Sequence, residues 1–237
     1  MKKIFLSLFC ITSFILFSYA QNFCTELFPL NEGAIMMTKS YDRNRNLLNT
    51  IELEIVKYKS TEIGNEVELK YTIFNKHNLL IEQGVLGTHC DNGKFNLAIL
   101  NSSQTEPFME LLVNSPDIIG NFLFYPPTSE NKNSSAVFTP PIEYPLRSKD
   151  TDKVYGKIII TNQDFADNEA VTTPVGIFNA SKTKIDFEIQ TEAGLKKYKH
   201  TEWYSVGAGI VRSETYDDFY NLVSYSELTT LESKASK

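Results

Sequence analysis

Two glycines at positions 207 and 209 give the chain its most suggestive chemical motif, a Gly-Ala-Gly step between runs of aromatic and β-branched residues. A Gly-x-Gly step that opens a helix can bind phosphate, and a dinucleotide site needs a third glycine three residues further on. That position holds Arg212, and no helical pattern follows it. Gly207 and Gly209 therefore predict a tight turn between two strands, where glycine accepts a positive φ angle.

Two other motifs match chemical patterns only in part. The run 42–46 opens like a calcium loop, but Leu47 and Leu53 stand where that loop requires Gly and Glu. The run 181–184 has the Ser-x-x-Lys spacing of penicillin-recognising enzymes, which place both residues on one face of a helix. Lys184 instead begins a strand-like alternation. We interpret both matches as chance.

The three histidines, His77, His89 and His200, are far apart in the sequence. A zinc site requires closely spaced ligand pairs, and the sequence contains none. A serine triad assembled from distant residues stays open, because sequence spacing does not test it. We predict no catalytic, metal-binding or cofactor-binding residues, no cofactor, and no enzymatic activity.

The first 20 residues have the order of a secretory signal peptide. Lys2 and Lys3 precede an apolar run over 4–17, and Ser18 and Ala20 supply the small residues of a cleavage site. The run is too short for a comfortable membrane span. We expect an exported mature chain, residues 21–237, without a transmembrane span and without a lipid on Cys24.

Export determines which cysteines remain in the mature chain and whether they can be oxidised. Cleavage would remove Cys10 and leave Cys24 and Cys90, which predict a disulfide in an oxidising compartment. The alternative, a thiol pair in metal or redox work, has no Cys-x-x-Cys motif to support it. The net charge of −6 argues against nucleic acid as a partner.

Period-two alternation of apolar and polar residues dominates the chain, as in residues 51–55, 67–73 and 185–189. Such alternation is typical of antiparallel strands with one buried and one solvated face. One short helix is expected near residues 105–114, capped by Thr105. Proline enrichment over 125–153 predicts a long loop within a single β-rich domain that spans residues 21–237.

Aromatic residues are numerous, with 12 Tyr and 16 Phe. Two interpretations stay open. Aromatic side chains favour sheets, so they could simply pack strands together. They could also line a concave sheet that holds an apolar ligand.

Four stretches together resemble the TapB-like family of exported bacterial envelope proteins, a domain of unknown function. They are residues 24–33, 90–95, 171–178, and 202–214 with the closing 224–228. The positions that carry the family signature are Gly33, Thr173, Pro174, Gly176, Phe178, Trp203, Tyr204, Gly207, Gly209 and Arg212.

The resemblance implies a mainly β fold, a curved antiparallel meander or open half-barrel, in the periplasm or outside a Gram-negative cell. It implies that Gly207–Gly209 is a structural turn and that Arg212 pairs with Glu214. The family's turn glycines are replaced by Asn46 and Asn221, and asparagine tolerates the left-handed conformation. The function that we predict is a binding module for an apolar or lipid-like ligand or an envelope protein partner. An assembly protein acting through a sheet edge and a hydrolase with a cryptic site are the alternatives.

Overall fold

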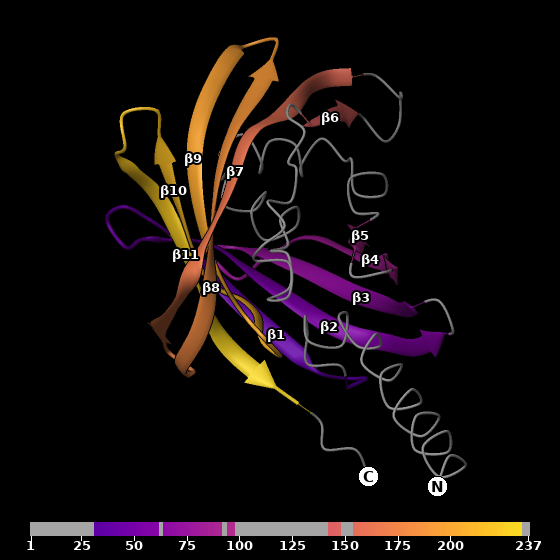
Figure 1. Cartoon of the computed structure of the whole chain (residues 1–237). Coiled ribbons are helices and arrows are strands. Elements are labelled where there is room, and N and C mark those ends of the chain that lie inside the picture. The colour runs from indigo at the N-terminus through magenta and orange to yellow at the C-terminus, as the bar shows by residue number, and fades with distance from the viewer. Residues whose placement is uncertain (1–30, 62–63, 92–93, 98–141, 148–153, 234–237) are drawn as a thin grey trace, which may run out of the picture.

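A computed structural model describes residues 31–61, 64–91, 94–97, 142–147 and 154–233. These residues form eleven strands (Figure 1). The strands are β1 (Ile35–Asp42), β2 (Leu47–Thr61), β3 (Gly64–Asn75), β4 (Leu80–Asp91), β5 (Lys94–Leu97), β6 (Ile142–Arg147), β7 (Val154–Thr173), β8 (Gly176–Thr191), β9 (Gly194–Ser205), β10 (Gly209–Asp217) and β11 (Leu222–Glu232). The mainly β fold predicted from the alternation is confirmed.

Several sequence predictions lie outside the described residues. They are the signal peptide over 1–20, Cys24, and the helix near 105–114. Cys90 belongs to β4, but its side chain is also outside the description. The predicted loop over 125–153 needs one correction, because residues 142–147 within it form β6. Pro145 is compatible with that strand because β6 lies at a sheet edge, where a missing N–H costs no ladder bond.

All strands pair antiparallel in one sheet, in the order β5-β4-β3-β2-β1-β11-β10-β9-β8-β7-β6. Two meanders meet where β1 pairs with β11, with Tyr41 opposite Tyr225 and Ser40 opposite Ser226. The two rings of that tyrosine pair stack with centroids 5.2 Å apart. Within the described residues β5 and β6 end the sheet at opposite edges and do not pair with each other, so the sheet is open.

The sheet curves strongly (Figure 1). Strand β7 comes within 8 Å of β10 and β11, measured between Cα atoms, although these strands lie three and four places away in the sheet. Bulges in the β7–β8 pairing interrupt the register at residues 160–162 and 166–169. Bulges bend a strand and increase its twist. They allow the outer half of the β7–β8 hairpin to fold back over the neighbouring strands.

One face of the sheet is buried and the other is solvated, as the alternation predicts. In β8, Ile185, Phe187 and Ile189 are at most 2% exposed. Between them, Asp186 and Glu188 lie on the opposite face and form ion pairs with lysines of β9. We call the two sides the buried face and the solvated face.

Three hairpins use the same five-residue turn. In the β1–β2 turn, one Asp42 oxygen accepts the N–H groups of Asn44 and Asn46 at 2.8 Å, and the other accepts the Asn46 side-chain amide. The left-handed residue is Arg45, with φ of 67°. The β3–β4 turn repeats this around Asn75 and Asn78, and the β10–β11 turn around Asp217, Tyr220 and Asn221.

This geometry corrects the role expected of Asn46 and Asn221. Neither residue takes the left-handed conformation; each supplies the amide that closes the turn on its aspartate. The positive φ falls one residue earlier, on Arg45 and Tyr220. The turns form as expected, but by a different mechanism.

Candidate functional site

The Gly-Ala-Gly step is a hairpin turn between β9 and β10. Gly207 and Gly209 have φ angles of 74° and 72°, in the region that favours glycine. The Ala208 N–H donates to the Ser205 carbonyl at 3.1 Å, and Val211 beyond the turn is fully buried. The step therefore reverses the direction of the chain and places Val211 in the core.

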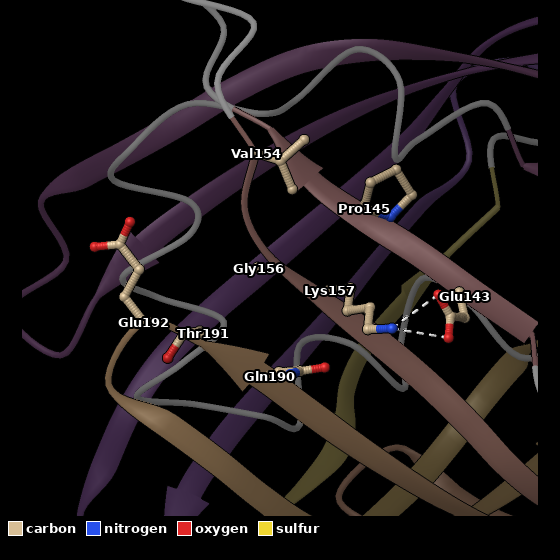
Figure 2. Close-up of a pocket in the computed structure, with 8 residues that line it drawn as sticks. All are labelled: Glu143, Pro145, Val154, Gly156, Lys157, Gln190, Thr191 and Glu192. Atoms are coloured by element: carbon tan, nitrogen blue, oxygen red, sulfur yellow. Dashed lines mark hydrogen bonds and ion pairs between the residues drawn. The ribbon is translucent and has the colours of Figure 1, made fainter.

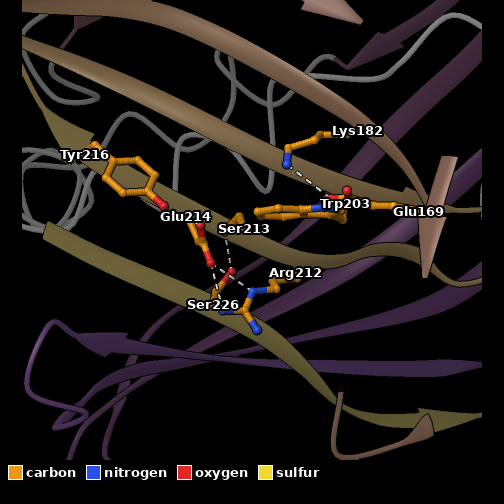
Figure 3. Close-up of polar contacts among 8 residues, drawn as sticks. All are labelled: Glu169, Lys182, Trp203, Arg212, Ser213, Glu214, Tyr216 and Ser226. Carbon is orange, nitrogen blue, oxygen red and sulfur yellow. Dashed lines mark hydrogen bonds and ion pairs between the residues drawn. The ribbon is translucent and has the colours of Figure 1, made fainter. Parts of the chain in front are cut away.

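Trp203 is held on the solvated face under the folded-back β7–β8 hairpin (Figure 3). Its indole N–H donates to the Glu169 carboxylate of β7, and only 7% of the residue is exposed. Lys182 of β8 lies 4.7 Å from the ring centroid and pairs with Glu169 at 3.1 Å. The indole bond first and Lys182 second lower the pKa of the Glu169 carboxyl. Trp203 thus fastens the hairpin to the sheet.

Arg212 pairs with Glu214 on the same face, as the resemblance implies. Its guanidinium donates to Glu214 Oε1 at 2.7 and 3.1 Å, and the Tyr216 hydroxyl donates to Oε2 at 2.5 Å (Figure 3). Burial, followed by the bond to Glu214, raises the pKa of Tyr216 to about 12. All charges in this group are matched, which favours a structural role.

The other signature residues hold turns and packing. Gly33 has φ of 78° and its N–H donates to the Ile55 carbonyl. Thr173 caps the β7–β8 turn, where its hydroxyl accepts the Val175 N–H and donates to the Gly176 carbonyl. The remaining members are Pro174 in that turn and Phe178 and Tyr204, which pack on or within the core. The structure brings Trp203 and Arg212 together on neighbouring strands but gathers no single site from the ten residues.

An open pocket of about 640 Å³ lies at the β6 edge of the sheet (Figure 2). Lys157 is the candidate reactive residue of this pocket. The Lys157 amine, however, is paired with the Glu143 carboxylate at 2.9 and 3.0 Å. Gly156 lets β7 approach β8 closely, since a Cβ there would meet the Gln190 carbonyl oxygen at 2.2 Å. The other lining residues are Pro145, Val154, Thr191 and Glu192. We assign no chemistry to this pocket.

Short strands end the sheet at both sides of its described part. Strand β5 has four residues and β6 has six, and β6 carries Pro145. Short strands and proline are the usual means by which proteins prevent edge-to-edge pairing. Residues 80–87 of β4 and 161–173 of β7 extend past these short strands without an outer strand partner among the described residues, so the edge-strand alternative has free backbone there.

The centre of the buried face carries a continuous row of polar side chains across six strands, which we call the polar row. Register places each member opposite the next: Asn49, Ser40, Ser226, Ser213, Glu202 and Thr183. Each is at most 1% exposed. Only the Ser213 and Ser226 hydroxyls, 2.5 Å apart, bond to each other within the row (Figure 3).

A second line of buried polar residues, Ser224, Thr215 and His200, runs beside the polar row. His200 Nδ1 lies 2.8 Å from the Thr215 hydroxyl, and Nε2 lies 3.1 Å from Glu202 Oε1. Burial lowers the pKa of His200 to about 3 and raises the pKa of Glu202 well above its usual value. Burial therefore disfavours the charged form of both groups.

The series Thr215, His200 and Glu202 has the order hydroxyl, imidazole, carboxyl that nucleophilic hydrolases use. A working triad needs an ionised carboxylate to stabilise the imidazolium that forms. Burial disfavours the ionised form of Glu202 and the protonated form of His200. This arrangement therefore disfavours the imidazolium that a working triad must form.

Five residues here keep buried polar atoms without a hydrogen-bond partner in the described part of the chain. Asn49 has both its amide nitrogen and oxygen unpartnered, and Glu202 has Oε2 unpartnered. The hydroxyls of Ser40, Thr183 and Ser224 are also without a partner. Such a group costs about 1–3 kcal/mol when buried. Four of the five lie in the polar row, so the cost is concentrated in one place.

Sequence reasoning missed the polar row. The signal was present in residues 213–215 and 224–226, where Ser and Thr occupy the inward positions of a strand alternation. Hydroxyl residues also suit a solvated face, so the pattern alone does not place them inside. His200 was noted only as a lone histidine.

The described residues contain neither a metal-binding cluster nor a helix able to span a membrane. Across these residues, no group of three or more His, Cys, Asp or Glu side chains could hold a metal ion. The same part of the chain has no helix with the length and hydropathy of a membrane span.

A family model covers most of the chain, and solved structures share its curved, open antiparallel sheet. The chain belongs to the DUF3108-like family, a domain family of unknown function, whose model matches residues 31–228. The finer assignment to the TapB-like family stays a prediction. No curated protein matches the chain.

Two solved structures share the fold. A protein described as a candidate lipoprotein from Parabacteroides distasonis has a TM-score of 0.72 and 25% identity, over 90% of this chain and 100% of that one. A candidate exported protein with a YmcC-like fold from Bacteroides fragilis has a TM-score of 0.68 and 24% identity, over 89% and 100%. Because the second structure is only 24% identical to this chain, it supports a shared fold and nothing further.

Proposed function

We propose that this chain is an exported binding protein that holds a lipid-like amphiphile against the buried face of its sheet. The polar row hydrogen-bonds the polar part of the ligand, and the apolar residues beside it contact the hydrocarbon. The protein acts by binding and has no catalytic residues. The observation that carries the proposal is the set of unpartnered polar atoms in the row.

In the absence of a ligand, these unpartnered polar atoms do not stabilise the fold. Replacing both members of a buried polar pair by apolar groups is nearly neutral, whereas an unpaired group destabilises the fold. A polar row that is costly for stability is expected where binding requires it, because functional sites trade stability for activity. A ligand that supplies donors and acceptors would satisfy Asn49, Ser40, Thr183 and Glu202.

The surrounding side chains fit hydrocarbon. Phe187 and Ile185 of β8 and Ile51 and Ile73 of β2 and β3 are at most 2% exposed and lie on the same face as the row. Apolar surface with a few placed polar groups is the usual composition of a small-molecule site. The aromatic lining expected from composition is only partial: aliphatic residues outnumber aromatic ones in the core.

The ligand's polar part should be uncharged. His200 and Glu202 are the two titratable groups of the row and its neighbouring line, and burial disfavours the charged form of each. An ionic head group would meet no countercharge there, and burying an unpaired ion is strongly unfavourable. Hydroxyl, amide and ester groups suit the site.

Export belongs to the proposal. The signal-peptide pattern of residues 1–20 and the neighbour described as a candidate lipoprotein support a location in the envelope or outside the cell. A disulfide between Cys24 and Cys90 within one domain over 21–237 fits that compartment. A protein partner in the envelope, to give or receive the ligand, is compatible with these features.

The test places a fluorescent reporter on the buried face. The Trp203→Phe change removes the only natural tryptophan, and Phe187→Trp adds one beside the row. Uncharged amphiphiles with dibrominated acyl chains, namely a monoacylglycerol, a diacylglycerol and acylated trehaloses, are added from dodecyl maltoside micelles. Bromine quenches only at short range, so we expect saturable quenching of the Phe187→Trp reporter.

The wild-type chain is the matched control, because Trp203 lies on the opposite face of the sheet and should not be quenched. Tyr198→Trp is a second reporter in case Phe187→Trp disturbs folding, since the two rings stack at 5.4 Å. Absence of quenching in both reporters, or equal quenching of Trp203, would contradict the proposal.

A further inference from the structure

Two neighbouring hairpin turns form a surface without charged residues. The β7–β8 turn lies within residues 170–180 and the β9–β10 turn within 203–211, and neither range contains Asp, Glu, Lys, Arg or His. Such ranges stand out in a chain of which 22% is charged. The Ser205 hydroxyl donates to the Asn179 carbonyl at 3.2 Å, which holds the two turns side by side. We call this pair of turns the uncharged tip.

The uncharged tip exposes aliphatic side chains to solvent. Ile177 is 74% exposed, Val206 65% and Val175 38%. A Cβ atom added to Gly176 or Gly207 would meet no atom of the described residues within 4 Å, apart from its chain neighbours, so both turns face open space. Single exposed apolar residues are common, but a group of them on neighbouring turns is typical of an interaction surface.

The backbone of the tip is fixed without help from these exposed side chains. The Thr173 hydroxyl accepts the Val175 N–H and donates to the Gly176 carbonyl, both at 3.3 Å. Pro174 between them has a restricted φ angle. Behind the turn, Val171 is only 6% exposed and anchors the hairpin. The tip is therefore preorganised, which reduces the entropy lost when it binds.

Charged groups begin directly behind the tip, and they are matched. Glu169 of β7 pairs with Lys182 of β8 at 3.1 Å, and Arg212 of β10 pairs with Glu214 at 2.7 Å. Burial disfavours the ionised form of Glu202 in β9. Among these groups no unmatched charge opposes entry of the tip into an apolar medium, and the ion pairs mark where the polar surface begins.

We propose that the uncharged tip docks the protein on a lipid membrane, with Ile177, Val206 and Val175 inserted at the boundary of head groups and acyl chains. Each apolar group buried there strengthens binding, and each charge opposes it. Protein interfaces instead depend on Trp, Tyr and Arg anchors and bury about 800 Å² on each partner. The exposed residues of the two turns include no such anchor. Docking does not depend on a ligand at the buried face.

The chain's charge indicates how docking occurs. A net charge of −6 opposes electrostatic attachment to anionic lipid. Apolar insertion requires no lipid charge, and salt screens charge interactions but not burial of apolar groups. Zwitterionic and anionic membranes should therefore bind the tip similarly at low and high salt.

The experiment measures cosedimentation of the exported chain, whose mass is checked first for removal of residues 1–20, with extruded vesicles. One set is phosphatidylcholine alone, and the other is phosphatidylcholine mixed with phosphatidylglycerol. The test variant carries Ile177→Ser and Val206→Ser. Phe219→Ser is the matched control, because Phe219 is 84% exposed on the turn at the other end of β10. Val206→Leu adds one CH₂ group to the tip.

We expect wild type to bind both kinds of vesicle, with less than about a twofold effect of salt. The double serine variant should bind at least about tenfold more weakly, with its thermal unfolding unchanged. Phe219→Ser should bind like wild type. Val206→Leu should bind about threefold more tightly, an effect that a loss of folded structure does not explain.

Three results would overturn the proposal: no binding to either vesicle, binding that requires phosphatidylglycerol and disappears in salt, and an equal loss in Phe219→Ser. A dimer in sedimentation velocity that the double serine variant dissociates would assign the tip to a second copy of the chain instead. None of these results decides the proposed function, which quenching by the brominated amphiphiles tests separately.

Discussion

Thr183 and Ser226 lie in the same buried row but differ in what their hydroxyls do. The Thr183 hydroxyl has no partner in the described part of the chain, whereas Ser226 bonds to Ser213 at 2.5 Å. Removing an unpaired hydroxyl relieves a desolvation cost, while removing one member of a pair creates such a cost. The two residues therefore give opposite predictions at the residue scale.

We predict that Thr183→Val, which keeps the side-chain shape, raises the free energy of unfolding by about 1 kcal/mol, and that Ser226→Ala lowers it by about 1 kcal/mol. Urea denaturation of the ligand-free chains measures both. The Thr183→Val chain should also bind the brominated amphiphiles less tightly. Destabilisation by Thr183→Val would show that its hydroxyl is satisfied in the native state.

Glu202 makes stability depend on pH in a direction opposite to that of most carboxyl groups. Burial raises its pKa, so the folded chain keeps a proton that the unfolded chain releases above about pH 4.5. Stability attributable to this group is complete below pH 4.5 and is lost as pH rises towards the folded pKa.

We predict that Glu202→Gln, which stays neutral, is stabilised relative to wild type by an amount that grows by more than about 1 kcal/mol from pH 5 to pH 8. The contribution of His200, whose pKa of about 3 gives the opposite slope between pH 3 and 6.5, is common to both chains and cancels in the difference. A difference independent of pH would mean that Glu202 is ionised in the folded state.

At the scale of elements, the repeated five-residue turn shows how the sheet tolerates few glycines. An Asp or Asn side chain fixes the loop, so a non-glycine residue can be held at positive φ, as Arg45 is at 67°. That conformation costs a residue with a Cβ atom about 1 kcal/mol. The turn is stable in spite of Arg45.

We predict that Arg45→Gly raises the free energy of unfolding by about 0.5–1 kcal/mol, because glycine accepts this conformation. Arg43→Gly is the matched control, since it removes the same charge from the same turn at a residue without a positive φ. It should be neutral or mildly destabilising. Thermal unfolding of the two variants side by side measures the contrast, and equal shifts would contradict the assigned turn geometry.

For the whole molecule, the sequence predicts the strands well because alternation and burial have the same period. Residues 185–189 alternate in the sequence and are buried alternately in the sheet. This reasoning does not reveal the polar row. A Ser or Thr at an inward position gives the same sequence alternation as one on the solvated face. Its members come from six strands, so only the register of the sheet brings them together.

Two further differences have local causes. The sequence predicts a positive φ at Asn46. The aspartate cap instead places it one residue earlier, on Arg45. Strand β6 was hidden in a proline-rich stretch, because proline disfavours strands except at an edge, and edge position depends on the whole topology.

The most direct test of the account is native mass spectrometry of the chain exported by a Gram-negative host and purified without refolding. We predict a reproducible mass increase corresponding to one lipid-like amphiphile per chain, removed by organic extraction. The Thr183→Val chain should retain less of it than wild type. A wild-type chain that carries no adduct under conditions that preserve non-covalent lipids, and takes none up when uncharged amphiphiles are added, would contradict the claim that the buried face is a binding site.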